Sequence, residues 1–343
     1  RDLYETVWGR RPSADWFDWR FRDNPAGDRV RMVLTERDGA VVGAEAALPY
    51  RLRVGDETVT ALQPVDWIVH PDHRGAGLAT RMAEARIERD TDAALYFNFP
   101  TPALRPLLAK LGWLTVGQPT TYYRVQDPPT VLPRRRDDVL LSAAARLATP
   151  LVRGHQRYRD WRATPRSDVT VERIDGVPAA TLADCYRASV PDRIHVVRDE
   201  RYLNWRFANP AWDCRTYIAR RDGRVVAGLV TCTETHAATT ATRLADALPL
   251  TAGSEGVFAA LVAAAVADAT EASVLTATAD PIPPEVLAAH GFVADDAPLL
   301  SRVVTETTHV VRPIPETDGW TLGGRAMDRT ENWHLALADQ DIA

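Results

Sequence analysis

Lysine, cysteine and long apolar runs are all scarce in this chain. Arginine supplies nearly all the positive charge, since Lys110 is the only lysine among 41 basic residues. The three cysteines, Cys185, Cys214 and Cys232, are widely spaced and odd in number, which predicts neither a zinc site nor a disulfide framework. No apolar run reaches membrane-spanning length and no signal peptide opens the chain, so we expect no integral membrane segment and a cytoplasmic protein.

The overall composition excludes one class of partner and sets the size of the core. A net charge of −5 and a pI near 5.9 leave no global basic footprint for nucleic acid. Hydrophobic residues make up 45% of the chain and charged residues 25%, as in globular proteins. With 343 residues, the chain is long enough for two domains of ordinary size.

The most informative stretch runs from Val65 to Ala85 and reads as a strand, a loop with two glycines, and a helix. Such a loop leaves backbone N–H groups free at a helix N-terminus, where they bind anions. Gly75 and Gly77 permit a sharp turn and close approach of a phosphate, and Arg74 adds a positive charge beside them. The Rossmann fingerprint and the P-loop do not fit, because the first has three glycines and the second requires Gly-Lys-Ser/Thr.

Two segments resemble the GNAT acetyltransferase superfamily. Val69-His70-Pro71-Asp72-His73-Arg74-Gly75-Ala76-Gly77 matches the usual setting Val-x-Pro-x-x-Arg-Gly-x-Gly of its cofactor loop. Leu107-Leu108-Ala109-Lys110-Leu111-Gly112-Trp113 is similar to its second signature, Leu-Tyr-x-Lys-Leu-Gly-Phe. The resemblance implies transfer of an acyl group, usually acetyl, from coenzyme A to an amine. An ordinary strand-to-helix loop with two structural glycines is the alternative interpretation.

The resemblance also assigns the cofactor contacts for acetyl-CoA. Backbone N–H groups of the loop and of the first helical turn should hold the pyrophosphate beside Arg74, and the main chain of the preceding strand should align the pantetheine arm. The predicted cofactor-binding residues are Ile68, Val69, Arg74, Gly75, Ala76, Gly77, Leu78 and Ala79.

A long-period repeat predicts two copies of one fold. Trp19-Arg20-Phe21 with Asn24-Pro25 recurs as Trp205-Arg206-Phe207 with Asn209-Pro210, and each copy is followed by a predicted hairpin. We therefore predict an α/β (α+β) protein with two tandem GNAT-type folds, each a mixed, mostly antiparallel sheet flanked by helices. In the first copy, strands and helices alternate and close with the stretch from Thr115 to Val125.

The predicted organisation has four parts. They are an N-terminal GNAT domain (1–126), a linker with an amphipathic helix from Asp137 to Tyr158 (127–168), a degenerate C-terminal copy (169–312) and a C-terminal extension (313–343). The linker helix is interpreted as packing between the domains, with attachment to a membrane surface as the alternative. The second copy has lost the loop arginine and carries an acid, Glu255, which would repel a pyrophosphate.

Two carboxylates are candidates for the base that takes a proton from the amine. Asp66 lies on the predicted central strand, with a structural role as its alternative, and Glu45 on the neighbouring strand is the second candidate. Leu108 stands where the family's general-acid tyrosine frequently falls. Tyr96, Tyr122 and Tyr123 are possible substitutes for that acid, or else packing residues.

Three functions follow as hypotheses. The first is an N-acetyltransferase acting on a small-molecule or peptide amine. The second is an aminoacyl transferase of the FemABX type, which also pairs two GNAT-like domains. It would need aminoacyl-tRNA as donor, and the acidic net charge of this chain counts against binding tRNA. The third is a non-catalytic acyl-CoA sensor. The sequence identifies neither the acceptor nor the oligomeric state.

Overall fold

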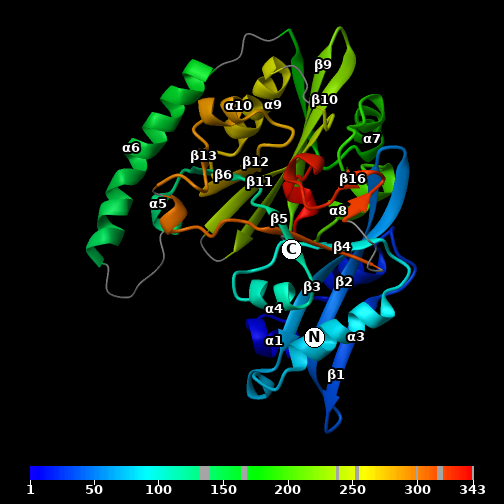
Figure 1. The fold of residues 1–343 in the computed structure, drawn as a ribbon. Coiled ribbons are helices and arrows are strands. Elements are labelled where there is room, and N and C mark those ends of the chain that lie inside the picture. Colours follow the sequence, from blue (N-terminus) through cyan, green and yellow to red (C-terminus); the bar gives the residue numbers. More distant parts are fainter. Residues whose placement is uncertain are drawn as a thin grey trace.

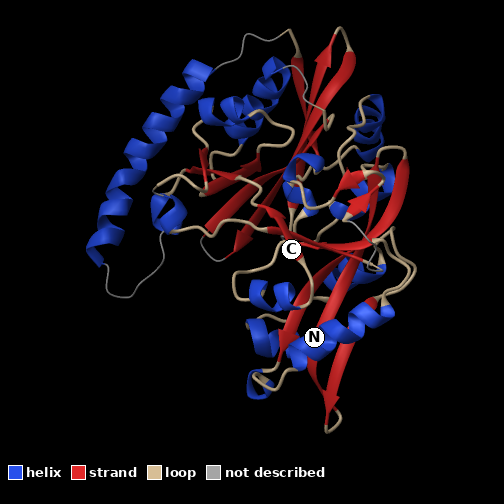
Figure 2. Cartoon of the chain, viewed as in Figure 1, coloured by secondary structure: helices blue, strands red, loops and turns tan. Residues whose placement is uncertain are grey.

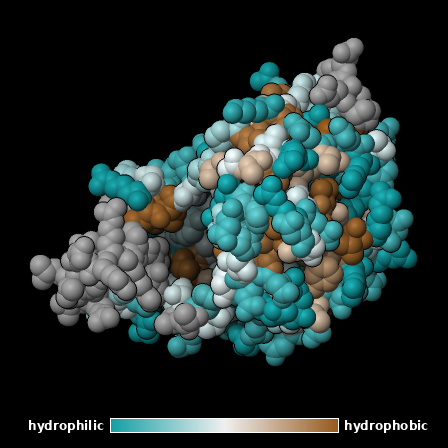
Figure 3. Space-filling view, turned by 90° about the horizontal axis from the view of Figure 1, so that it is seen from below, coloured by the Kyte–Doolittle hydropathy of each residue, from teal (hydrophilic) through white to brown (hydrophobic). Residues whose placement is uncertain are grey.

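The computed structural model describes residues 1–131, 139–163, 168–236, 239–251, 255–298, 300–314 and 320–341. Within these ranges two mixed β-sheets form two lobes, with helices on their faces (Figures 1 and 2). Seen from below, the surface is mostly hydrophilic with separate hydrophobic patches (Figure 3). The described part of the chain contains no helix that is both long and apolar enough to cross a membrane. The architecture is the mixed α/β fold with two sheet bodies that the sequence predicted.

The first sheet occupies the lower lobe in Figure 1 and has the order β1-β2-β3-β4-β14-β5, with β8 pairing to β2. Its pairs are antiparallel except for β3 with β4. The strands are β1 (Arg31–Arg37), β2 (Ala40–Val54), β3 (Glu57–Val69), β4 (Leu95–Asn98), β5 (Leu114–Gly117), β8 (His195–Val196) and β14 (His309–Pro313).

The second sheet has the order β13-β6-β12-β11-β10-β9-β7, and only β11 and β12 are parallel. Its strands are β6 (Thr121–Val125), β7 (Thr170–Asp175), β9 (Asp213–Arg221), β10 (Arg224–His236), β11 (Thr239–Leu248), β12 (Val274–Thr278) and β13 (Val293–Ala294). A small hairpin of β15 (Thr321–Leu322) and β16 (Arg325–Ala326) completes the described strands.

Each sheet includes strands from the other half of the chain, since the first contains β8 and β14 and the second contains β6. Strand β6 leaves the first repeat and pairs with β12 and β13, and β14 follows the second repeat yet lies between β4 and β5. The prediction that Thr115 to Val125 closes the first sheet is therefore wrong for residues 121–125. Gln118 precedes Pro119 and so favours an extended conformation, which carries the chain on to the second sheet. The four predicted domain boundaries stay a prediction.

The described helices fall before and after the start of the linker. The helices before the linker are α1 (Asp2–Trp8), α2 (Ala14–Phe17), η1 (Asp18–Arg22), η2 (Pro71–His73), α3 (Leu78–Arg89) and α4 (Arg105–Lys110). The remaining helices are α5 (Pro128–Val131), α6 (Val139–Ala163), α7 (Ala179–Ala188), α8 (Glu200–Arg206), α9 (Glu255–Asp268), α10 (Pro284–Ala289), η3 (Leu300–Arg302), η4 (Thr330–Asn332) and η5 (Leu337–Asp339).

The two copies of the Trp-Arg-Phe motif meet at the junction of the lobes. The indole Nε1 of Trp19 donates to the carbonyl of Trp205 at 2.6 Å, and the indole of Trp205 donates to the carbonyl of Trp19 at 2.7 Å. The two rings stack with centroids 6.3 Å apart. This reciprocal contact shows that the repeated residues form a pseudo-symmetric joint between the copies.

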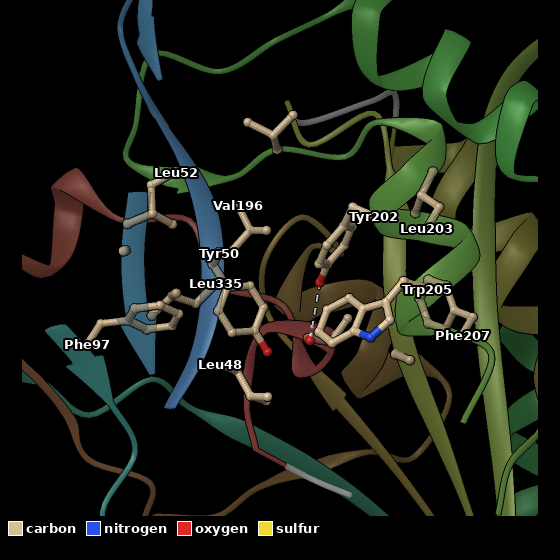
Figure 4. Close-up of a cluster of buried hydrophobic side chains, with 14 of the residues drawn as sticks. Leu48, Tyr50, Leu52, Phe97, Val196, Tyr202, Leu203, Trp205, Phe207 and Leu335 are labelled. Carbon is tan, nitrogen blue, oxygen red and sulfur yellow. Dashed lines mark hydrogen bonds between the residues drawn. The ribbon is translucent and has the colours of Figure 1, made fainter. Parts of the chain in front are cut away.

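The C-terminal segment lies in this joint and is almost wholly buried from Trp333 to Gln340. Figure 4 shows Tyr50 and Phe97 of the first sheet, Tyr202 and Trp205 of α8, and Leu335 of the segment packed in one cluster. Tyr202 donates a hydrogen bond to the carbonyl of Ala338 at 3.3 Å. The extension that the sequence left unassigned is thus part of the core between the lobes.

The linker helix α6 runs along the outside of the second lobe (Figure 1) rather than between the two domains. Arg124 of β6 makes two hydrogen bonds to the carboxylate of Asp160, at 2.7 and 2.8 Å, and ties the helix to the sheet. Leu151, Tyr158 and Trp161 are more than half exposed. The predicted start at Asp137 lies outside the described residues.

Two of the three cysteines are joined. Cys214 on β9 lies directly opposite Cys232 on β10, and their sulfur atoms form a disulfide, whereas Cys185 is free and buried. The sequence-based expectation of no disulfide is therefore wrong. Facing positions on neighbouring strands bring the two residues together, although they lie 18 positions apart in the sequence. The expected cytoplasmic location loses the support that the cysteine pattern gave it.

Candidate active site

The glycine loop joins β3 to α3 and is exposed. Gly75 and Gly77 have φ values of 78° and 71°, and nothing lies within 4 Å of where a Cβ would stand on either residue. Gly77 is the N-cap of α3 and has no side chain to accept the first N–H groups of the helix. The loop therefore offers an uncapped helix N-terminus with open space in front of it, which fits a pyrophosphate.

Arg74 and the nearby His70 have different roles in this loop. The Nε of Arg74 donates to the carbonyl of Val69 at 3.3 Å, so its exposed guanidinium stays beside the loop. The Nδ1 of His70 accepts from the backbone N–H of Asp72 at 3.3 Å. This bond caps η2 and gives His70 a structural role.

Strands β3 and β4 diverge next to the loop. They pair only at Ala61 with Leu95 and at Leu62 with Tyr96. Beyond this point the side-chain amide of buried Asn98 bridges the gap by donating to the carbonyl of Pro64 at 3.1 Å. From Val65 onward no described strand pairs with β3 on this side, so its main chain, including Ile68 and Val69, has the open edge that the predicted pantetheine contacts require.

A β-bulge places Asp66 at the end of this edge. The register changes from Ala44 opposite Ile68 to Ala46 opposite Val65, which leaves one extra residue on β3. Asp66 has a φ of 50°, a conformation that aspartate tolerates better than most residues. The bulge brings Asp66 to a cavity beneath α1 and α2, where it is among the lining residues.

The carboxylate of Asp66 belongs to a three-residue charge cluster. Arg20 of η1 donates from Nε to Asp66 at 3.0 Å and from one terminal nitrogen to Asp341 at 2.6 Å. Arg20 is only 2% exposed, whereas the side chain of Asp341 is 26% exposed. Burial raises the pKa of Asp66, and the positive charge of Arg20 opposes that rise. The cluster, here called the Arg20 cluster, carries a formal charge of −1.

Glu45, the other predicted base, lies on the opposite face of the sheet. It faces the bulge from β2, but its neighbours Ala44 and Ala46 line the cavity while its own side chain points to α3. There it accepts from the Nε of Arg86 at 2.9 Å and is 1% exposed. Burial raises the pKa of Glu45 to about 7. The structure therefore separates the two candidates and brings only Asp66 to the cavity.

The cavity beside Asp66 has a volume of about 500 Å³. It lies between α1, α2 and the hairpin of β1 and β2, and the side chains around it are mainly apolar or aromatic. Its only charged lining residues are Asp66 and, in the first positions of the described chain, Arg1 and Asp2. Its position against the bulge makes it the candidate acceptor site.

None of the three tyrosines considered as a general acid reaches this cavity. The hydroxyl of Tyr96 donates to Asp90 at 3.1 Å, within the core beneath α3. Tyr122 and Tyr123 lie on β6 and therefore belong to the second sheet. Leu108 is 1% exposed. The interpretation of these tyrosines as packing residues is the one that the structure supports.

Sequence reasoning did not find Arg20 and Asp341 as site residues. Arg20 appeared only as part of the repeat, and Asp341 is 321 positions away from it. The repeat does contain a signal, because an arginine fixed inside an aromatic motif in both copies must find acceptors when it is buried. Its counterpart Arg206 is 3% exposed and donates to the carbonyls of Ala338 and Gln340.

Comparisons with known proteins agree with this geometry. A family model described as an acetyltransferase (GNAT) domain matches residues 1–116. This segment ends in β5, just before the chain crosses to the second sheet. Residues 1–116 therefore match a GNAT acetyltransferase domain, and the two sheets are compatible with a tandem arrangement of two such folds.

Three solved structures share the fold over 91–92% of this chain at 12% identity. A GCN5-related N-acetyltransferase from Anabaena variabilis has a TM-score of 0.59, with 69% of that chain covered. A probable N-acyltransferase from Enterococcus faecalis has a TM-score of 0.55 with 68% covered, and Eis1 from Mycobacterium abscessus 0.53 with 70% covered. No curated protein matches the chain.

Proposed function

We propose that this protein is an N-acetyltransferase that moves an acetyl group from acetyl-CoA to a small-molecule or peptide amine. The observation that carries the proposal is the bulge in β3. The proposal is supported by the position of Asp66 in the lining of the cavity, a few residues before the uncapped helix N-terminus that suits a pyrophosphate. Acyl donor and acceptor would thus meet on one strand.

Asp66 is proposed as the proton acceptor. The amine nitrogen attacks the thioester carbonyl carbon, a C–N bond forms, and the C–S bond breaks. The proton of the amine passes to the carboxylate of Asp66, and the thiolate leaves and takes a proton from solvent. A thiolate whose conjugate acid has a pKa of about 8.5 leaves readily, so the leucine at position 108 need not abolish the reaction.

The remaining residues would bind and orient the donor. Backbone N–H groups from Gly75 to Ala79 and the charge of Arg74 would hold the pyrophosphate. A main-chain N–H near Ile68 would polarise the thioester carbonyl, as backbone donors do in oxyanion holes. The corresponding loop of the second repeat includes residues outside the described ranges, and its predicted degeneracy stays a proposal.

Calorimetric titration of acetyl-CoA into the protein and into Arg74→Glu tests the donor site. We expect one site per chain and roughly 100-fold weaker binding in the variant, because a charge-assisted contact is replaced by repulsion. Arg89→Glu is the matched control, since Arg89 is also exposed but lies at the far end of α3, about 16 Å along the helix from its first residue. Equal binding by the protein and Arg74→Glu would contradict the proposed site.

Release of free thiol separates this function from the other two hypotheses. An acyl-CoA sensor would bind acetyl-CoA without accelerating thiol release when amines are added. An aminoacyl transferase would not depend on Arg74, because its donor carries no coenzyme A pyrophosphate. Amine-dependent thiol release that is lost in Arg74→Glu is the result expected of the acetyltransferase.

A further inference from the structure

We infer that the acceptor is a primary amine carried on a hydrophobic body, such as an arylalkylamine, bound with its ammonium group toward Asp66. This inference rests on the proposed function and names its substrate class. Its basis is the contrast between the mainly apolar lining of the cavity and the carboxylate of Asp66, which joins that lining to the Arg20 cluster behind it.

The walls of the cavity favour an apolar ligand. Trp16 and Phe21 meet edge to face with centroids 6.0 Å apart, and Tyr4 packs against Trp16 at 5.5 Å. Leu34 and Val41, on neighbouring strands at the mouth, are 53% and 38% exposed and extend the same apolar lining outward. A bound hydrophobic group would pack on the aromatic rings and would remove Leu34 and Val41 from water, which is the main source of affinity in such sites.

The inner end of the cavity favours one cation. The Arg20 cluster pairs two carboxylates with one guanidinium and so has a formal charge of −1, and Asp66 is its one member among the lining residues. The guanidinium of Arg20 lies 5.2 Å from the ring of Trp16 and 5.6 Å from that of Phe21, behind the side chains that line the cavity. Arg10 lies over Tyr4 at 5.8 Å, outside the lining, and its positive charge also acts on Asp66, so the lining itself presents a carboxylate and no buried cation.

Polycationic acceptors do not match this arrangement. A polyamine or an aminosugar would bring further ammonium or hydroxyl groups against the apolar walls, where buried polar groups without partners are costly. Arg1 and Asp2 are exposed and have opposite charges, so they add no net attraction for a second cation. The charge and polarity of the site thus select a single ammonium with an apolar substituent.

The test compares tryptamine and 2-phenylethylamine with spermidine and glucosamine, using acetyl-CoA as donor. Calorimetry measures binding of each amine to the protein loaded with acetyl-CoA, and thiol release measures turnover. We expect the two aromatic amines to bind, and to have kcat/KM, at least about 10-fold more favourably than the two polar amines.

Leu34→Glu tests the mouth of the cavity. It places a carboxylate on an exposed wall position, so tryptamine should bind about 10-fold more weakly while acetyl-CoA binding stays within about twofold. Val293→Glu is the matched control, since Val293 is a 43% exposed residue on β13 of the other sheet. No change in tryptamine binding should follow there.

The possible outcomes distinguish a wrong substrate class from a wrong proposed function. Preference for spermidine or glucosamine, with turnover, would overturn the inference and leave the acetyltransferase intact. Faster transfer from octanoyl-CoA than from acetyl-CoA to polar amines would also overturn it, because the cavity would then hold the acyl chain. Tight tryptamine binding that Leu34→Glu weakens, but without thiol release, would support the ligand class and refute the acetyltransferase.

Discussion

Asp66→Asn is expected to lower kcat for amine acetylation by about 10²- to 10⁴-fold, the range typical for loss of a general base. Asparagine keeps the shape of the side chain and tolerates the φ of 50° at this position, so the bulge should persist. Acetyl-CoA binding should change by less than about twofold, because Asp66 lies in the acceptor cavity rather than in the glycine loop. Steady-state kinetics and calorimetry measure the two quantities.

The pH profile separates a proton acceptor from a structural residue. Burial raises the pKa of Asp66, and the base acts only in its ionised form. The value of kcat/KM should therefore fall as the pH decreases through this raised pKa, and Asp66→Asn should lack that acidic limb. Asp56→Asn, in the exposed turn at the other end of β3, should retain the full profile. An unchanged acidic limb in Asp66→Asn would show that another group takes the proton.

Arg198→Met is expected to destabilise the fold by about 3–5 kcal/mol, the usual cost of removing one partner from a buried ion pair. Arg198 donates to Asp246 of β11 and to Asp339 of the C-terminal segment, both at 2.8 Å. All three side chains are fully buried. Removing the arginine leaves two carboxylates without a cation at the joint between the lobes. Urea denaturation followed by circular dichroism measures the loss.

Two further variants test the cause of that loss. Arg201→Met, an exposed position on the adjacent helix α8, should change the free energy of unfolding by no more than about 0.5 kcal/mol. Arg198→Met combined with Asp246→Asn and Asp339→Asn should recover part of the stability, because no buried charge is left unpaired. Arg198→Met unfolding at the same urea concentration as the unaltered protein would show that the triad contributes little.

The junction between the lobes matters for the proposed function, because the C-terminal segment contacts both the buried Arg198 and the Arg20 cluster. Asp339 binds Arg198, and Asp341, two residues further on, binds Arg20 beside the cavity. The carbonyl of Asp339 also accepts from the buried side chain of Gln63 on β3 at 2.9 Å. The position of Asp341 in the Arg20 cluster therefore depends on contacts with both lobes.

The sequence by itself determined the features that depend on contiguous residues. The glycine loop could be predicted because the end of β3, Arg74, Gly75, Gly77 and the start of α3 are adjacent, and the proposed anion site is made of their backbone without help from distant residues. The two sheet bodies could be predicted from the repeat, because each copy encodes the same local order of helix and hairpin.

Only the tertiary structure decided the features that depend on distant residues. It exchanged β6 and β14 between the sheets, turned Glu45 away from Asp66, and joined Cys214 to Cys232. It also brought Asp341 to Arg20. Hydrophobic periodicity records that a residue is buried, but not which of several buried partners it meets, and those pairings are selected by packing of the whole chain. The cavity beside Asp66 is made of such pairings, so the proposed donor loop was readable in the sequence and the proposed acceptor site was not.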